Sequence, residues 1–340
     1  MTNLQVKTLV LAAGIASSGC GPFPDVRAIA AGDIEPPILL VTEAVGPRSV
    51  ELIFDEPIVL IEKSTLLAPT IPVSSVLCTE TVIRYDFATD LMPGARYLLE
   101  SIVKDSKHNQ MKFITVFYGY NGRAPDLVIN EFITQGSKSH PDLVELFVLS
   151  DGNLAGLCLF EGTPERFTDR FIFPSVEVKR GDYILVHFKP AGEEDELDET
   201  HKRETSGGTD AHPGAWDFWV PAGNGLSGNN GVISLYTSPN GNLIDGVLYS
   251  NRTSASDDKY RGFGTKATMQ NADRLFSDGG WKAAGELVTP EDAINPDDST
   301  ATRSICRSSN SDDTDSRWDW HTVPTRGSTF GSGNNNEVHE

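Results

Sequence analysis

Short runs of alternating polar and apolar residues follow one another from residue 38 onward, separated by turn-forming residues. Ser49–Phe54 alternates in this way and ends at Asp55-Glu56-Pro57, and Tyr97–Val103 follows the turn at Pro93-Gly94. Alternation with a period of two is typical of a strand that buries one face. Strands at this spacing, with turns between them, predict a small β-sandwich over residues 36–120.

A second series of strand patterns follows a short hinge at Asn121–Pro125. Leu127–Phe132 and Asp142–Leu149 are its first two runs, and they place Glu131 and Glu145 on adjacent expected strands. Further runs are Leu154–Leu159, Arg170–Pro174, Val178–Val186, Gly231–Tyr236 and Leu243–Tyr249. The pattern predicts a second sandwich over residues 125–331, so the expected fold class is all-β with two tandem domains.

Two segments interrupt the second series and are interpreted as insertions. Residues 190–226 carry an acidic run and the aromatic group around Asp217, whereas residues 251–302 carry short helical patterns. One helix is expected from Thr268 to Phe276, and another near Trp281–Leu287. The polar tail at 332–340 is expected to be disordered, because its composition offers little apolar surface to bury.

The N-terminus has the features of an export signal. Lys7 precedes a short apolar run, and small residues then lead to Cys20. A run this short does not span a bilayer as a helix, whereas a basic start, an apolar core and a small-residue cleavage site are typical of signal peptides. Residues 1–19 are therefore expected to be removed, with residues 20–35 forming an extended tether.

The residues before Cys20 resemble the lipobox of bacterial lipoproteins, although Ser17 stands where that motif has Leu. The resemblance implies that Cys20 is acylated and that the protein is anchored in the cell envelope, at the outer membrane. Cleavage as an ordinary secretory protein is the alternative.

Both domains resemble known families. Val50–Pro57 resembles the V-x-L-x-F-x-E-P strand of bacterial Ig-like domains, and Leu91–Tyr97 is similar to their L-x-P-G-x-x-Y turn. Leu127–Phe132, Asp142–Leu146 and the terminal Asp319-Trp320 resemble the ordered motifs of lamin-tail domains. These resemblances imply two Ig-like sandwiches, the second of lamin-tail type with insertions of loops and short helices.

Charge and cysteine spacing narrow the functional classes. The 28 Lys and Arg residues against 48 Asp and Glu give a net charge of −20, which disfavours a nucleic-acid partner. Cys78, Cys158 and Cys306 show no zinc-ligand spacing. Buried free thiols are expected, with a Cys158–Cys306 disulfide as the alternative.

A few groups of residues are candidates for binding a metal ion or a partner. Clustered oxygen ligands at Asp312, Asp313 and Asp315 are compatible with calcium, but in the resembling family this stretch is mainly a turn, and no other cofactor is expected. His201 and His212 lie in the acidic insertion near Asp210, where a weak metal site is the alternative to a solvated loop. Trp216, Phe218 and Trp219 are a candidate contact surface for a protein or glycan; the alternative is that they cap the open edge of the second domain.

Catalysis is not expected. Glu131 and Glu145 could approach one another as a carboxylate pair, but no nucleophile elbow or His-rich metal motif is present. The sequence favours a non-enzymatic binding or adhesion lipoprotein. The alternatives are a structural spacer of the envelope and a metal-dependent hydrolase.

Overall fold

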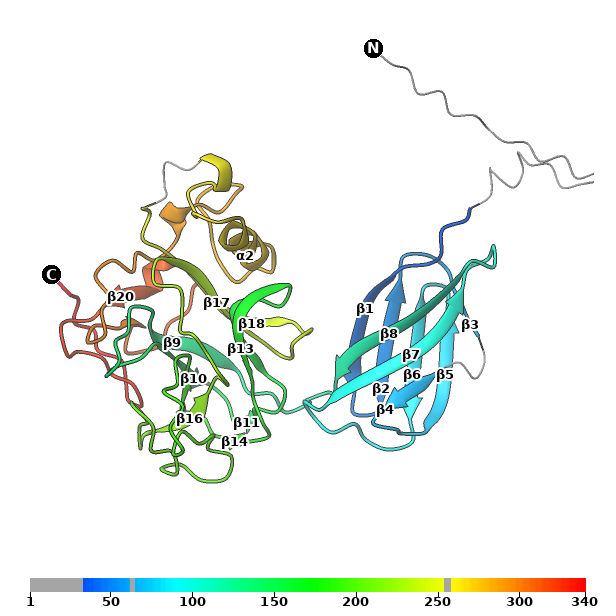
Figure 1. The fold of residues 1–340 in the computed structure, drawn as a ribbon, viewed down its shortest axis with the longest axis horizontal. Coiled ribbons are helices and arrows are strands. Elements are labelled where there is room, and N and C mark those ends of the chain that lie inside the picture. The colour runs from blue at the N-terminus through cyan, green and yellow to red at the C-terminus, as the bar shows by residue number, and fades with distance from the viewer. Residues whose placement is uncertain (1–32, 62–64, 254–257) are drawn as a thin grey trace, which may run out of the picture.

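The computed structural model describes residues 33–61, 65–253 and 258–340, and their fold is nearly all β. Cys20, the expected signal peptide and most of the tether lie outside these residues. Figure 1 shows two bodies joined by a thin connection. Their two main hydrophobic clusters fall on either side of residues 121–124, one within residues 50–117 and the other within residues 127–320.

The first domain packs two β-sheets around one core. Its strands are β1 (Leu39–Gly46), β2 (Ser49–Phe54), β3 (Val59–Leu60), β4 (Leu66–Ala68), β5 (Val73–Thr79), β6 (Val82–Phe87), β7 (Arg96–Lys104) and β8 (Gln110–Tyr118). One sheet has the order β1-β2-β6-β5, and in the other β7 pairs with β3, β4 and β8. The inward residues of β2 and β7, such as Leu52 and Leu99, are fully buried between the sheets, as their alternation predicts.

The second domain also contains two main sheets. Its strands are β9 (Leu127–Ile133), β10 (Leu143–Val148), β11 (Gly152–Asn153), β12 (Cys158–Thr163), β13 (Arg166–Ile172), β14 (Glu177–Val178), β15 (Tyr183–His187), β16 (Ala215–Trp219), β17 (Asn230–Tyr236), β18 (Leu243–Ser250), β19 (Ile305–Arg307) and β20 (Trp320–Thr322). A six-stranded sheet has the order β16-β15-β10-β9-β19-β20, and a four-stranded sheet has the order β13-β12-β17-β18. Their facing sides form a core that includes Ile129, Val144 and Leu235.

The insertions are parts of the folded domain. Within residues 190–226, β16 pairs in parallel with β15 and so extends the six-stranded sheet. Within residues 251–302, α2 (Lys266–Ser277) contains the expected helix and packs on β17 and β12. The second expected helix, near Trp281–Leu287, is wrong: the segment is irregular, and Trp281 is buried with its indole N–H donating to the Asp292 carbonyl at 3.1 Å.

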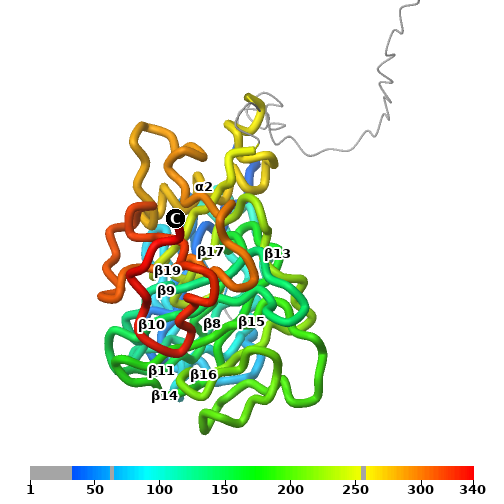
Figure 2. Tube along the Cα trace, turned by 90° about the vertical axis from the view of Figure 1, so that its left-hand side faces the viewer, coloured from blue at the N-terminus to red at the C-terminus, as the bar shows by residue number. Residues whose placement is uncertain are grey.

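The expectation of a disordered tail at 332–340 is also wrong. Figure 2 shows the C-terminal segment in front of β19, β9 and β10, and hydrogen bonds join it to that sheet. Asn334 is 7% exposed and exchanges hydrogen bonds with the Asn130 side chain. A polar segment is held in this way because buried polar groups of the sheet require partners.

Close backbone contact joins the two domains. The Asn121 amide donates to the carbonyls of Asn153 and Ala155 at 2.7 and 2.9 Å. Gly94 and Gly156 both have positive φ, at 70° and 82°, and a Cβ on Gly94 would lie 2.4 Å from the Gly156 nitrogen. Larger residues at either position would therefore push the domains apart.

Candidate functional site

The outer face of the six-stranded sheet is unusually polar for a covered surface. It carries Glu131 on β9, Glu145 on β10, His187 on β15 and Asp217 on β16, all of them buried. Two segments cover this face: the insertion before β16 and residues 328–336, which we name the C-terminal strap. The sheet therefore has an apolar core side and a second side, also closed from solvent, that combines these polar groups with buried Leu143, Leu185 and Ala215.

Glu131 and Glu145 lie directly opposite each other on the paired strands β9 and β10, which confirms that the two acids approach one another. Glu131 accepts hydrogen bonds from the Thr329 backbone N–H at 2.9 Å and from its hydroxyl at 2.7 Å. Glu145 accepts from the Gly331 N–H at 2.6 Å and from the Asn130 amide at 2.8 Å. The strap thus supplies donors to both carboxyl groups.

Burial changes the ionisation of this pair. Loss of solvation raises the pKa of Glu131, and loss of solvation together with repulsion from Glu131 holds the pKa of Glu145 well above its ordinary range. Both side chains are 0% exposed, so a substrate has no path between them in this conformation. The pair contributes to the strap's attachment and is poorly placed for hydrolysis.

The thiols of the second domain are equally enclosed. Cys158 and Cys306 are buried and free, so the alternative of a disulfide between them is wrong. Burial raises the pKa of both thiols. His321 lies 3.6 Å from the Cys306 sulfur, but its Nε2 is 2.8 Å from the Asn335 carbonyl, which accepts its proton. This arrangement does not generate a thiolate.

The aromatic insertion forms an edge strand. Phe218 is 0% exposed and Trp219 is 5% exposed, so these two side chains do not form the candidate contact surface. Trp216 is half-buried against the core. Parallel pairing of β16 with β15 explains this burial, because it directs Phe218 into the sandwich core and Trp219 beneath the insertion. They cap the open edge of the sheet.

A buried histidine fixes the conformation of this insertion. His187 Nε2 lies 2.8 Å from an Asp217 carboxylate oxygen, and its ring stacks on Trp219 at 3.8 Å. The other Asp217 oxygen accepts the backbone N–H of His212 at 3.0 Å. The buried pair thereby positions His212, which lies at the surface nearby.

His212 belongs to an open pocket that we name the His140–Arg326 pocket. Its volume is about 370 Å³, and its polar lining includes His140, Asp210, His212 and Arg326. Ile133 and Phe330 contribute apolar surface. The lining comes from the end of β9 and the loop after it, from the insertion before β16, from the segment before β19 and from the C-terminal segment. A pocket with an apolar lining and a few polar groups is the usual form of a ligand site.

Hydrogen bonds within the pocket determine what its histidines offer a ligand. His140 Nδ1 lies 3.1 Å from Asp210, which leaves Nε2 as an acceptor when the ring is neutral. His212 Nδ1 accepts the Gly214 N–H at 3.0 Å, so the neutral ring carries its proton on Nε2 and donates there. The two rings therefore present opposite hydrogen-bonding characters.

The acidic loop after β19 surrounds an arginine. Arg307 is 0% exposed, and its Nη1 donates to the Asp312 carbonyl at 3.1 Å and to the Asp313 carboxylate at 2.9 Å. Its Nη2 lies 3.2 Å from Asp245. Of the predicted calcium ligands, Asp313 and Asp315 come together with Asp245, whereas the Asp312 carboxylate accepts from the Ser308 hydroxyl. A guanidinium therefore already supplies positive charge here.

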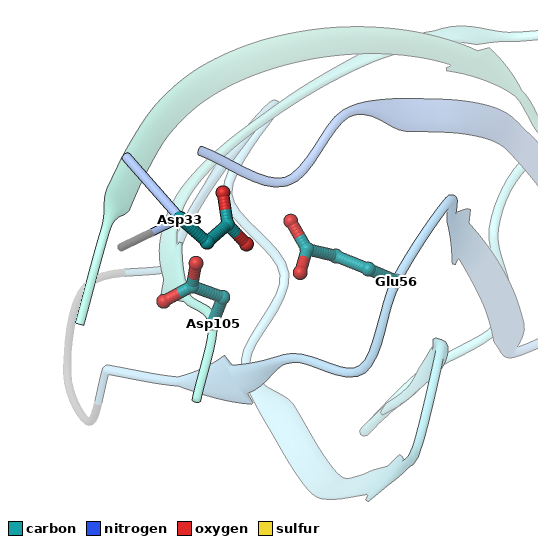
Figure 3. Close-up of side chains that lie close together, drawn as sticks. All are labelled: Asp33, Glu56 and Asp105. Atoms are coloured by element: carbon teal, nitrogen blue, oxygen red, sulfur yellow. The ribbon is translucent and has the colours of Figure 1, made fainter. Parts of the chain in front are cut away.

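A second acidic group lies in the first domain. Figure 3 shows Asp33, Glu56 and Asp105 close together. Asp105 is already satisfied by the backbone N–H groups of Lys107 and Asn109, both at 2.8 Å. Desolvation, followed by repulsion from Asp105 and Asp33, raises the pKa of Glu56. The group resembles a turn organised by Asp105 more than a formed metal centre.

Sequence reasoning found only part of the pocket. It placed His212 near Asp210 in the acidic insertion, and the structure brings both to the pocket, whereas exposed His201 is not among its lining residues. His140 and Arg326 gave no signal, because they are single residues far from the insertion in sequence. Their proximity follows only from the course of the C-terminal segment.

The fold defines an all-β protein of two packed domains, and the comparisons identify the second. Residues 125–322 match the family model TP_1001_2nd, described as "protein second domain", and the chain belongs to this family. A relative from Treponema pallidum (strain Nichols), called "Uncharacterized protein", is 27% identical over 161 residues. That match covers 46% of this chain and 40% of the relative, so the chain spans less than half of that protein.

Solved structures give weaker similarities. The S-layer protein rSbsC(31-844) has a TM-score of 0.24 and 11% identity, covering 62% of this chain and 40% of that chain. Dimeric latent PorU from Porphyromonas gingivalis has a TM-score of 0.19 and 13% identity, covering 63% of this chain and 19% of that chain. These scores are too low to support a functional argument. Among the described residues, no helix has the length and apolar character needed to cross a bilayer.

Proposed function

We propose that the protein is an exported, lipid-anchored binding module without catalytic activity. The His140–Arg326 pocket carries this proposal, because it is open and combines apolar surface with groups of different hydrogen-bonding character. The groups best suited to catalysis, Glu131, Glu145 and Cys306, are instead fully buried. In this proposal the first domain holds the second domain away from the membrane.

The anchoring part of the proposal rests on the sequence around Cys20, and the lamin-tail resemblance of residues 125–331 supports a sandwich that presents ligand-binding loops. Acylation at Cys20 would attach the chain to a bacterial membrane, at the outer membrane in our proposal. A single lipid chain gives weak attachment, whereas several chains on one cysteine hold a protein firmly. Replacement of Cys20 by Ser should move the protein from the membrane fraction to the soluble fraction.

Two other functions make different predictions. A structural spacer would not depend on the pocket, and a metal-dependent hydrolase would show turnover that stops on Glu131→Gln or Glu145→Gln. Deletion of residues 190–226 is unsuitable as a test, because it removes β16 from the sheet. Point changes in the pocket separate the functions without disturbing a strand.

Site-specific crosslinking tests the binding function directly. A photoreactive residue at Ala211, which lines the pocket, should crosslink a molecule in the native envelope. The same residue at exposed Met92 in the first domain is the matched control. A product that forms only from position 211 and is lost on His212→Ala supports a binding module. Identical products from both positions, or none from position 211, support the spacer.

A further inference from the structure

We propose that the His140–Arg326 pocket recognises a free carboxylate that lies beside an apolar side chain and an N–H group, the chemistry of an N-acylated apolar amino acid. A free N-acyl amino acid and the C-terminal residue of a peptide share this chemistry. The inference rests on the proposed binding function and names the class of ligand.

The first observation is the uneven charge of the pocket. Arg326 lies on the side of the pocket that the C-terminal segment forms. None of the ion pairs within residues 33–61, 65–253 and 258–340 includes Arg326. Asp210 lies on the opposite segment, where His140 pairs with it. Arg326 is exposed at the pocket, and in a chain of net charge −20 an arginine without an acidic partner is a favourable place for an anion. Guanidinium also matches the planar geometry of a carboxylate.

The second observation is the fixed orientation of His212. Gly214 donates its N–H to His212 Nδ1, and a Cβ on Gly331 would lie only 2.1 Å from that same nitrogen. The ring therefore packs tightly against two glycines, and its protonated Nε2 points away from them. This donor has no protein partner among the hydrogen bonds of the described residues, and it can complement Arg326 at a ligand carboxylate.

The third observation concerns the side of the pocket next to the insertion. Because Asp210 accepts the Nδ1 proton of His140, the Nε2 of His140 is free to accept an N–H from a ligand. A ligand with only negative groups would meet Asp210 unfavourably. A ligand with a carboxylate at one end and an amide N–H at the other satisfies both sides.

The apolar lining and the volume of the pocket limit the size and the polarity of the rest of the ligand. Ile133 is 2% exposed and lines the pocket together with Phe330. A volume of about 370 Å³ is at the lower end of ligand pockets and accommodates one or two amino-acid residues. An apolar side chain such as leucine can cover this surface.

Calorimetric titration of the purified full-length protein tests the assignment with matched ligands. N-acetyl-leucine and a tripeptide ending in leucine carry the carboxylate, whereas N-acetyl-leucinamide and the amidated tripeptide lack it. We expect at least one acid to bind about tenfold or more tightly than its amide, since a charged hydrogen bond contributes more than about 1.4 kcal/mol. Tighter binding of N-acetyl-leucine would identify a free N-acyl amino acid as the source of the carboxylate, and tighter binding of the tripeptide would identify the C-terminal residue of a peptide.

Substitutions of single residues test whether the preference for the acid over the amide arises in the pocket. Arg326→Gln should abolish the difference between acid and amide, whereas Arg123→Gln, an exposed arginine at the domain junction, should preserve it. Tryptophan emission checks that each variant is folded. Equal binding of acid and amide that His212→Ala weakens would overturn the carboxylate assignment but leave the binding function standing. Failure of every ligand, together with absence of a crosslink from Ala211, would overturn both.

Discussion

Replacement of Arg307 by Met is the perturbation whose effect the structure defines most sharply. The guanidinium is fully buried and stacks on Trp320, with 4.5 Å between its central carbon and the ring centroid. It donates to the Ile129 carbonyl at 2.7 Å and pairs with Asp245, which is also fully buried. Methionine can fill much of the volume but supplies neither the charge nor the donors.

The expected magnitude follows from the charge left behind. Removing one member of a buried ion pair costs about 3–5 kcal/mol, because the remaining carboxylate has neither water nor a counter-charge. Asp245 would retain only the N–H groups of Ile129 and Gly246 as donors. With a urea m-value of about 2 kcal/mol/M, the unfolding midpoint of the second domain should fall by about 2 M.

Tryptophan fluorescence measures this transition specifically. All five tryptophans of the sequence lie within residues 125–331, at positions 216, 219, 281, 318 and 320. Their emission therefore reports the second domain while the first contributes no signal. Urea titration of the wild type and of Arg307→Met gives the two midpoints.

Two further variants make the test decisive. Arg123→Met breaks an ion pair whose side chains are 66% and 61% exposed, and it should cost no more than about 1 kcal/mol. Arg307→Met combined with Asp245→Asn should recover part of the loss, because the uncompensated buried charge is gone. If Arg307→Met unfolds at the same urea concentration as Arg123→Met, the buried cation is not what holds this loop to the sheet.

Other predictions follow from the same buried groups. Burial raises the pKa of Glu161 from 4.5 to about 7, so its contribution to stability is complete below pH 4.5 and is lost as the pH rises through 7. Glu161→Gln should therefore flatten this decline by about 3 kcal/mol in urea titrations at several pH values, whereas exposed Glu165→Gln should leave it unchanged. Burial and repulsion from Glu131 raise the pKa of Glu145 in the same direction, so Glu145→Gln should raise the unfolding midpoint at mildly alkaline pH and have little effect below pH 4.5. A loss of stability at both pH values would contradict this cost of a buried charge. Removal of residues 332–340 should cost about 1–3 kcal/mol by leaving the Asn130 side chain without Asn334, and an unchanged midpoint would show that the tail is not docked. Millimolar calcium should not change the melting temperature of the wild type but should raise that of Arg307→Met, where the acidic loop lacks its internal cation.

Strand patterns predicted the sheets because alternation is a local property. The alternating run at Ser49–Phe54 forms β2, and the runs containing Glu131 and Glu145 form the paired strands β9 and β10. The helix expected at Thr268–Phe276 lies within α2. In each case the apolar face of one short segment carries enough information to identify the element.

What covers the second face of the sheet was not predictable in this way. Alternation from Leu127 and Ile129 would place Glu131 on the core side, but an irregularity in the β9–β10 register turns it to the other face. There Thr329, almost 200 residues later in the chain, covers it. Composition suggested a solvated tail, although Asn334 donates to the buried Asn130 side chain and the adjacent Gly331 N–H donates to buried Glu145. The pocket was missed for the same reason, because Arg326 reaches His140 and His212 only through the path of the C-terminal segment.

Docking of the C-terminal strap is the claim on which the pocket depends, and amide hydrogen exchange at Thr329 and Gly331 tests it most directly. Both N–H groups donate to buried glutamates, at 2.9 and 2.6 Å. We predict that they exchange slowly, with protection approaching that of the Ile129 amide in β9. Exchange as fast as in an unstructured peptide would mean that the strap is undocked, and the His140–Arg326 pocket would lose the side formed by Phe330.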